Sequence, residues 1–317
     1  MRKNVLKTLL FLLPLLALLV LLGPVFAPKN NTLAAGMLET DPMAIFSQPE
    51  NSIDLLFLGD SEAYSGFVPM ELWQDYGIAS FVSACVDQKP YETEAFLKAA
   101  LKRQSPKVVV LETNVLYRVY SRVDRIVPGA QRLFPVLRYH SRWKSLTLRD
   151  FQAPEYTGEY PDRGYHLLLT AVPREDLESY MAPTDAREAL SSANLRSLRN
   201  ISKLCREKNI RLILYSVPSP ENWNMARHNT MEDLARELGI LYLDGNLESR
   251  DIDWNLDTYD NGDHLNYYGA AKITRRLGDF LWDSLPDHRG EAAYAAWDRD
   301  LAALPERIQA KMEETKE

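Results

Sequence analysis

The chain has 317 residues, of which 46% are hydrophobic and 26% are charged. These fractions are ordinary for a globular protein, so the composition excludes a largely disordered or fibrous chain. The formal net charge is -7 at pH 7. An acidic chain lacks the broad basic surface that neutralises phosphates, so we expect no nucleic-acid partner.

An apolar segment opens the chain. Arg2, Lys3 and Lys7 precede an uncharged, leucine-rich stretch over residues 8–28. About 20 apolar residues cross the roughly 30 Å of bilayer hydrocarbon, and flanking basic residues stay in the cytoplasm. We therefore expect residues 1–28 to be a cytoplasmic stub and a single-pass transmembrane anchor in the cell membrane, with the rest of the chain extracytoplasmic.

A cleaved signal peptide is the alternative interpretation of this segment. Val25, Phe26 and Ala27 resemble a cleavage site of small residues, and a cut after Ala27 would release the rest of the chain. Pro28 would then follow the cut directly, which favours the retained anchor.

A short tether precedes the main domain. Residues 29–52 contain scattered Asn, Pro, Gly and Ser, as connecting segments do. The apolar run from Ile53 to Leu58 ends in Gly59-Asp60-Ser61, which predicts a buried strand followed by a turn. We expect one domain over residues 53–285.

Helical and strand patterns alternate through this domain. The expected elements are a helix at 91–103, a strand at 107–112, a helix at 194–208, a strand at 211–217, a helix at 230–238, a strand at 240–244 and a helix at 267–285. The alternation stops at an insertion over about residues 117–185, and residues 286–317 have the composition of a helical tail. This order predicts an α/β fold with a mainly parallel sheet flanked by helices.

Ser61 is the candidate nucleophile. Active sites of open α/β sheets lie at the carboxyl ends of the strands, where the sequence places this serine. A serine hydroxyl needs a base to take its proton and an acid to orient that base. His264, flanked by Asp260 and Asp263 directly before a predicted helix, supplies the general base.

These two stretches resemble the first and last blocks of the SGNH/GDSL hydrolase superfamily. Gly59-Asp60-Ser61 matches the first block, Asp263-His264 matches the last, and the resemblance covers about residues 53–285. It implies a three-layer, flavodoxin-like fold and serine chemistry through an acyl intermediate. That chemistry needs no metal, and no phosphate-binding loop or dinucleotide fingerprint is present, so we expect no cofactor.

The resemblance also implies an oxyanion hole. In the superfamily the nucleophile's own N–H is joined by a Gly after the second strand and an Asn after the third. Asn114 follows the third expected strand and fits the second role. No glycine stands in the Gly block, at residues 83–88. The candidate donors there are a backbone N–H of Ala84, Cys85 or Asp87, or Gln88, and they would act together with Ser61.

The acid of the triad has two candidates. The superfamily places Asp three residues before His, but here that position is Asn261. We favour Asp260, because a loop containing Asn261-Gly262 can fold back onto the imidazole. Asp263 points away from His264 if both are extended, and it stays the alternative.

Taken with the anchor, the motifs look like the membrane-anchored SGNH-like proteins that accompany membrane-bound O-acyltransferases. This group includes alginate O-acetylation proteins and, more distantly, the D-alanyl-lipoteichoic acid transfer protein. The resemblance implies an esterase or acyltransferase acting on O-acyl groups, with O-acetyl expected, of a cell-envelope polysaccharide or teichoic acid. It also implies a membrane-bound O-acyltransferase as partner.

A basic segment from Arg118 to Arg149 contains the aromatic residues Tyr139, His140 and Trp143, which are candidates for binding sugar rings. A non-catalytic, polymer-binding assembly subunit and a secreted lipase or esterase are the alternative functions. Cys85 and Cys205 could pair in an oxidising compartment, but two separate thiols are the interpretation that we favour.

Overall fold

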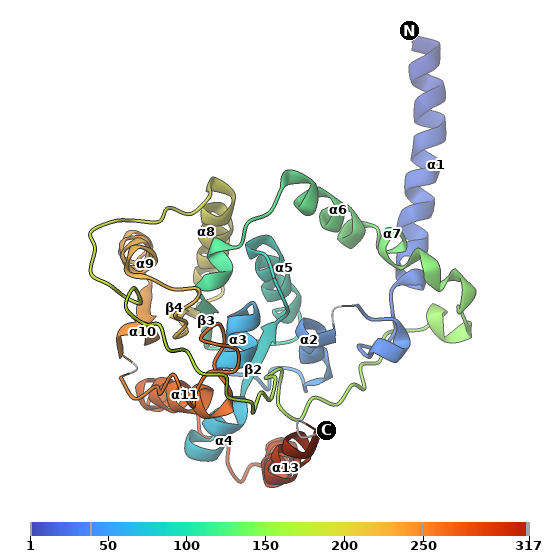
Figure 1. Ribbon diagram of the computed structural model, residues 1–317. Helices are drawn as coiled ribbons and strands as arrows, with labels where there is room; N and C mark the ends of the chain where they lie inside the picture. Colours follow the sequence, from blue (N-terminus) through green and yellow to red (C-terminus); the bar gives the residue numbers. More distant parts are fainter. Residues whose placement is uncertain (1, 39, 249, 315–317) are drawn as a thin grey trace. The chain divides into compact units, whose positions relative to one another are not determined.

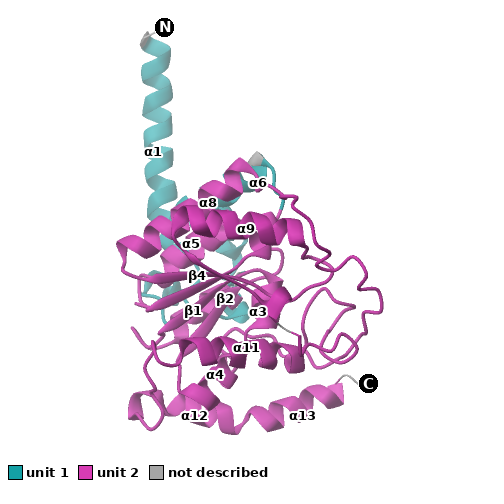
Figure 2. Ribbon diagram, turned by 90° about the vertical axis from the view of Figure 1, so that its left-hand side faces the viewer, with its two compact units in different colours: residues 1–40, 119–158 teal, residues 41–118, 159–317 magenta. Residues whose placement is uncertain are grey.

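The computed structural model describes residues 2–38, 40–248 and 250–314. The chain forms two compact units. The first consists of Met1–Thr40 and Val119–Gly158, and the second of Asp41–Arg118 and Glu159–Glu317 (Figure 2).

The second unit is built on a parallel five-stranded sheet with the order β2-β1-β3-β4-β5. Its strands are β1 (Leu55–Gly59), β2 (Ser80–Ala84), β3 (Val108–Glu112), β4 (Arg211–Ser216) and β5 (Leu241–Asp244). Every residue of β1, β2 and β3 is buried, as expected for strands covered on both faces. The order is that of flavodoxin-like folds, so the predicted fold class is confirmed.

Helices cover both faces of this sheet and make three layers (Figure 2). Leu56 and Leu58 of β1 pack with α5 (Pro90–Ala100), α8 (Ser192–Glu207) and α9 (Met225–Leu238). Leu55 and Phe57 point the other way, because successive side chains of a strand alternate between faces. They pack with α3 (Ser61–Gly66), α4 (Pro69–Tyr76) and α11 (Tyr267–Leu281).

The expected strands and helices of this domain are present, within a few residues of the predicted bounds. The helix expected at 230–238 begins earlier, at Met225, because the side chain of Asn224 caps it by accepting from the N–H of Arg227 at 3.0 Å. The described part of this unit also contains the shorter helices η2 (Ala44–Ser47), η3 (Asn114–Tyr117) and α10 (Gly245–Glu248). A further short helix, α2, covers Thr40–Met43.

Residues 159–190 are irregular, yet they are fastened to the sheet. Val82 N–H donates to Arg163 O at 2.9 Å, and Tyr267 N–H donates to Leu168 O at 2.7 Å. Gly164 makes the close approach possible, because its φ is +86° and a Cβ there would lie 2.0 Å from Val82 O. The segment therefore belongs to the second unit and connects the β2 edge to the start of α11.

The tail after residue 285 is helical, and its first half is part of the core. It consists of η6 (Ala292–Tyr294), α12 (Ala295–Ala302) and α13 (Leu304–Glu314), and its last three residues lie outside the described part. Trp297 is 3% exposed and packs on Trp73 of α4, with ring centroids 5.2 Å apart. Burial of this aromatic surface fixes the tail to the layer that contains α4.

The first unit contains the N-terminal helix α1 (Arg2–Phe26), which is long and apolar enough to cross a membrane. Its other helices are η1 (Leu33–Ala35), α6 (Arg122–Leu133), α7 (Pro135–Tyr139), η4 (His140–Lys144) and η5 (Leu148–Phe151). Helices α7, η4 and η5 contact α1, and Figure 1 shows α7 beside the C-terminal end of α1. Part of the predicted insertion therefore forms one compact unit with the expected anchor.

Candidate active site

Ser61 is the first residue of α3 and follows the turn that ends β1. The turn is tight: a Cβ on Gly59 would lie 2.7 Å from Ala63 Cβ and 2.8 Å from Glu112 Cβ. Asp60 caps α3, since its carboxylate accepts from the N–H of Glu62 at 3.2 Å. The sequence therefore places a serine hydroxyl at the carboxyl edge of the sheet, where it is 6% exposed.

His264 lies on a short loop that folds back on itself. An antiparallel bridge pairs Thr258 with Leu265, and the turn between them uses positive φ at Asn261 (61°) and Gly262 (88°). This turn returns Asp260 to the histidine four residues later.

Asp260 is the carboxylate that hydrogen-bonds to the imidazole. Its Oδ2 lies 2.7 Å from His264 Nδ1, and its Oδ1 accepts from the N–H of His264 at 2.7 Å. Asp263 Oδ1 is 3.7 Å from the same ring nitrogen and accepts instead from the side chain of Asn222. The structure therefore pairs Asp260 with the histidine and leaves Asp263 as a nearby charge.

This arrangement sets the protonation of the pair. Burial lowers the pKa of His264, but the hydrogen bond to Asp260 and the charges of Asp263, Asp260 and Asp60 outweigh it, so the pKa is raised. Burial raises the pKa of Asp260, and the hydrogen bonds from His264 reverse this, so the pKa is lowered. An ionised Asp260 holds the proton on Nδ1 and leaves the lone pair on Nε2.

His264 Nε2 is buried and has no hydrogen-bond partner among the described residues. The bond from Ser61 Oγ that a triad requires is therefore not made in this state. The start of α3, which carries Ser61, is nevertheless close to the loop that carries His264. A carboxylate oxygen of Glu62, the residue after Ser61, lies within 4.8 Å of a ring nitrogen of His264.

Asn114 presents a second unpaired group. It is 4% exposed, and its Oδ1 accepts from Arg227 Nη1 at 3.3 Å, which fixes the direction of the amide. Its Nδ2 is buried without a partner in the part of the chain that the structure describes. A buried amide nitrogen with no acceptor is costly unless something else, such as a developing oxyanion, uses it.

The Cys85 and Gln88 donors have other partners here. The N–H of Cys85 donates to Gln88 Oε1 at 3.1 Å, and Gln88 Nε2 donates to Thr93 Oγ1 at 2.8 Å. Gln88 is fully buried and ties the β2–α5 loop together. In this structure neither group is available to an oxyanion, because the loop uses both to satisfy its own polar atoms. No disulfide joins Cys85 to Cys205.

Arg118 was expected only as the first residue of the basic segment, whereas the structure places it in the candidate site. Its Nε donates to the fully buried Asp60, and its Nη2 lies 3.4 Å from Ser61 Oγ. Burial raises the pKa of Asp60, and the charge of Arg118 offsets part of this effect. A cation four residues after Asn114 was visible in the sequence, but its pairing with Asp60 depends on β1 and β3 being neighbours.

Two further buried carboxylates lie beside these groups. Burial is the main cause that raises the pKa of Glu62 well above its usual range, and the charge of Glu112 is the second cause. The pKa of Glu112 is also raised well above its usual range, mainly by burial and secondly by the charge of Asp60. Arg118 therefore lies near three buried acidic side chains, and the raised pKa values of Glu62 and Glu112 favour their neutral forms.

Glu62, Asp263 and His264 offer ligand atoms that lie within 4.8 Å of one another and could hold a metal ion. Glu62 is 1% exposed and its Oε2 has no partner among the described residues. Binding through Nε2 would occupy the lone pair that a serine mechanism needs.

The three aromatic candidates belong to the first unit. Trp143 is 64% exposed, with Lys144 Nζ 5.7 Å from its ring centroid, and His140 is also exposed. Tyr139 is half-buried and its hydroxyl lies 3.8 Å from Met37 Sδ. Sugar binding by Tyr139, His140 and Trp143 stays a prediction.

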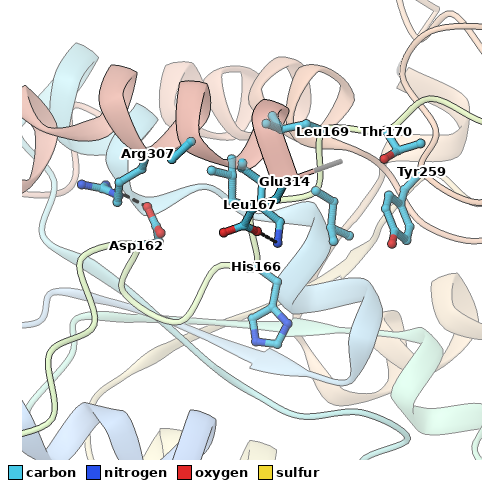
Figure 3. Close-up of a pocket in the computed structure, with 11 residues that line it drawn as sticks. Asp162, His166, Leu167, Leu169, Thr170, Tyr259, Arg307 and Glu314 are labelled. Atoms are coloured by element: carbon cyan, nitrogen blue, oxygen red, sulfur yellow. Dashed lines mark hydrogen bonds and ion pairs between the residues drawn. The ribbon is translucent and has the colours of Figure 1, made fainter. Parts of the chain in front are cut away.

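A pocket of about 710 Å³ lies beside the loop of Asp260 and His264. Figure 3 shows Arg307 paired with Asp162 at one end of the pocket and Tyr259 at the other. Ser61 and His264 do not line it. The pocket therefore borders the candidate site through Tyr259 and is separate from its reactive atoms.

No family model matches the chain, and a search of curated proteins finds no significant match. Solved structures do resemble it. A lipase/acylhydrolase from Enterococcus faecalis is 10% identical, covers 74% of this chain with 98% of its own, and has a TM-score of 0.41. A GDSL-like lipase from Bacteroides thetaiotaomicron is 11% identical, over 73% and 88% of the two chains, with a TM-score of 0.38. The acetyl xylan esterase AlAXEase is 14% identical, covers 74% of this chain with 100% of its own, and has a TM-score of 0.38. At such identities the activity of this chain has to be argued from its own residues.

Proposed function

We propose that this protein is an extracytoplasmic serine esterase or acyltransferase that acts on O-acyl groups of a cell-envelope polymer. The observation that carries the proposal is the Asp260–His264 pair, whose Nε2 is buried and unpaired close to the turn that carries Ser61. An oriented imidazole with a vacant lone pair is the group that a serine nucleophile needs.

In the proposed mechanism, Ser61 Oγ attacks the acyl carbonyl carbon and its proton passes to His264 Nε2. Asp260 stabilises the resulting imidazolium through Nδ1. The proton then passes to the leaving alcohol as the acyl-serine forms. Water, or a hydroxyl of the acceptor, next gives its proton to His264 and attacks the carbonyl carbon of the acyl-serine. The bond between that carbon and Ser61 Oγ then breaks, and Oγ takes the proton back from His264, which releases the acid or the acylated acceptor and regenerates Ser61.

The oxyanion of each tetrahedral intermediate needs hydrogen-bond donors. The N–H of Ser61 and Nδ2 of Asn114 are two of them in the proposed site, and the buried, unpaired state of Nδ2 supports this role. Arg118, whose Nη2 is 3.4 Å from Ser61 Oγ, would supply a third and charged donor. It would replace the donors that Cys85 and Gln88 use within their own loop.

The geometry of the site does not specify a substrate, so the proposed substrate rests on the sequence motifs and the anchor. We propose O-acetyl groups of a cell-envelope polysaccharide or teichoic acid as the substrate and a membrane-bound O-acyltransferase as the partner. A single-pass α1 would hold the site next to such polymers outside the cytoplasm.

Intact-mass spectrometry of the full-length protein in detergent, after incubation with p-nitrophenyl acetate, tests the covalent step. We expect one acetyl adduct that peptide mapping places on Ser61 and that Ser61→Ala abolishes. Ser65→Ala is a matched control, because Ser65 is a buried serine of the same helix whose hydroxyl donates to Ser61 O at 2.7 Å. If the wild-type protein forms no adduct where a known esterase does, the proposal is wrong.

A non-catalytic polymer-binding subunit is the second candidate, and the unmade hydrogen bond between Ser61 and His264 favours it. This alternative predicts that a fluorophosphonate probe does not label the protein although an envelope glycan binds. Labelling of Ser61 would rule it out.

A further inference from the structure

Helix α6 in the first unit carries an apolar face that is exposed. Val123, Ile126, Val127 and Leu133 are 64%, 67%, 48% and 69% exposed. Ile126, Val127 and Leu133 follow Val123 by three, four and ten residues, which places all of them on one side of a helix. A globular protein ordinarily buries such a face, so α6 has the pattern of a helix that lies on an apolar surface.

The segment after α6 is fastened to the end of α1. The last carbonyl groups of a helix lack partners within it, and here two cations supply them. Arg142 Nη1 donates to Phe26 O at 2.6 Å, and Lys29 Nζ donates to Pro24 O at 2.8 Å. Asp150 in turn pairs with Arg142 at 2.6 Å, so η4 and η5 are tied to the same point.

This contact fixes the depth of the segment relative to α1. Val5 to Leu21 are largely exposed, whereas Gly23 is buried, and a Cβ on Gly23 would lie 3.1 Å from Pro135 Cδ. A span of about 20 residues at 1.5 Å each, counted from Thr8, ends near Ala27. Pro135 therefore lies about one helical turn inside the outer end of the span, at the boundary between hydrocarbon and headgroups.

Helix α6 is joined to α7 by Phe134 alone. In Figure 1 it leads into α7 beside the C-terminal end of α1, and its axis runs across that of α1. If α1 crosses a bilayer, α6 is placed along the outer surface of that bilayer.

The charges and aromatic residues of the segment suit that surface. Residues 119–158 hold seven basic and three acidic residues, in a chain whose net charge is -7. Arg125 and Lys144 are exposed, as are Trp143 (64%) and Phe151 (69%). Basic residues favour anionic headgroups, and aromatic rings favour the interface.

We propose that residues 119–158 form a membrane-surface element, in which α6 lies in the outer interface of an anionic bilayer with its apolar face inserted. The proposal depends on α1 spanning the membrane, as proposed above, and not on the chemistry of Ser61. It gives the segment a binding partner, the lipid bilayer, that is distinct from a sugar or a protein.

Spin labels on the full-length protein in lipid nanodiscs test this proposal. A nitroxide is attached at Ile126→Cys, at Arg125→Cys on the opposite face of α6, or at Trp282→Cys in the second unit, in a Cys85→Ser/Cys205→Ser background. In discs with phosphatidylglycerol, we expect the ratio of oxygen to nickel-complex accessibility to be several-fold higher at 126 than at the other two sites. Circular dichroism shows whether each variant is folded.

Resistance to alkaline carbonate extraction reports separately whether α1 is embedded. If the protein is embedded and the label at 126 is as accessible to nickel as the label at 282, the proposal is overturned. Protection of 126 only in native membranes would assign the face to a protein partner and overturn it equally. If the label at 126 lies as deep in discs of pure phosphatidylcholine as in discs with phosphatidylglycerol, the role of anionic headgroups is refuted.

Discussion

Asp260 and Asp263 lie on one short loop, yet they differ in what they bond. Asp260 makes two hydrogen bonds to His264, one to the ring and one to the backbone, whereas Asp263 accepts from Asn222. Only the first arrangement can fix the tautomer of the imidazole. The two residues are thus a matched pair for testing which carboxylate serves the base.

We expect Asp260→Asn to reduce kcat for an acetyl ester by about 10³–10⁴-fold, because an amide there stabilises the wrong tautomer and no imidazolium. Asp263→Asn should reduce kcat less than tenfold, since it removes only a neighbouring charge. Steady-state kinetics on both variants, with melting temperatures as a check of folding, provides the measurement. The reverse order of effects would make Asp263 the acid.

The raised pKa of His264 predicts the direction of the pH dependence. A general base must be neutral, so kcat/KM should fall as the pH drops through the pKa, and that limb should lie above the ordinary value of about 6.5. Asp263→Asn removes one of the charges that raise the pKa, so it should move the limb to lower pH. A pH profile of kcat/KM for both proteins measures this, and an unmoved or upward-moved limb would contradict it.

Arg118 combines a structural role with the proposed catalytic one. Arg118→Gln leaves the buried carboxylate of Asp60 without its cation, and breaking such a pair costs about 3–5 kcal/mol. The double change Asp60→Asn/Arg118→Gln should recover most of that stability in urea unfolding, because no lone charge remains buried. We expect it to leave kcat at least about 10²-fold low, the cost of losing one oxyanion donor. Full recovery of kcat would show that Arg118 acts only on stability.

At the scale of elements, β1 and the turn after it depend on a glycine. Ala63 Cβ and Glu112 Cβ, on α3 and β3, both approach the position that a Cβ on Gly59 would take. Because the neighbours belong to two elements, a side chain at Gly59 would force one of them away. The turn that presents Ser61 is therefore set by packing as well as by backbone geometry.

Gly59→Ala should destabilise the fold by about 1–3 kcal/mol, the usual effect of overpacking a dense interior, and should lower acyl-enzyme formation at Ser61. Gly129→Ala is the control, because nothing lies within 4 Å of a Cβ there and alanine favours helix α6. Denaturant midpoints measure both. Equal midpoints for the two variants would mean that the turn at Gly59 relaxes freely.

The sequence predicted the alternating elements well, because each strand is a short apolar run and each helix has an apolar stripe. It did not show that residues 159–190 lie along the sheet, since they have no regular period. Their place depends on bonds such as Val82 N–H to Arg163 O, which join residues far apart in the chain. Trp297 of the tail is similar, because its burial depends on distant residues such as Trp73 and Arg163.

At the scale of the whole molecule, α1 is long and apolar enough to cross a membrane, and its retention can be tested. If it is retained as an anchor, the full-length chain should stay in the membrane pellet after alkaline carbonate and be released by detergent. N-terminal sequencing of the protein from its native host shows directly whether residues 1–27 are retained. A mature chain that begins at Pro28 and appears in the medium would instead support the secreted esterase.

The sequence by itself determined the fold class, the position of Ser61 at a strand end, and the candidacy of His264, Asp260 and Asn114, because these follow from local patterns and motif spacing. Tertiary structure alone paired Arg118 with Asp60, committed Cys85 and Gln88 to their own loop, and gathered residues 119–158 with α1 into one unit. These facts depend on contacts between distant segments. Such contacts form only when apolar burial brings strands and helices together, and no local pattern records them.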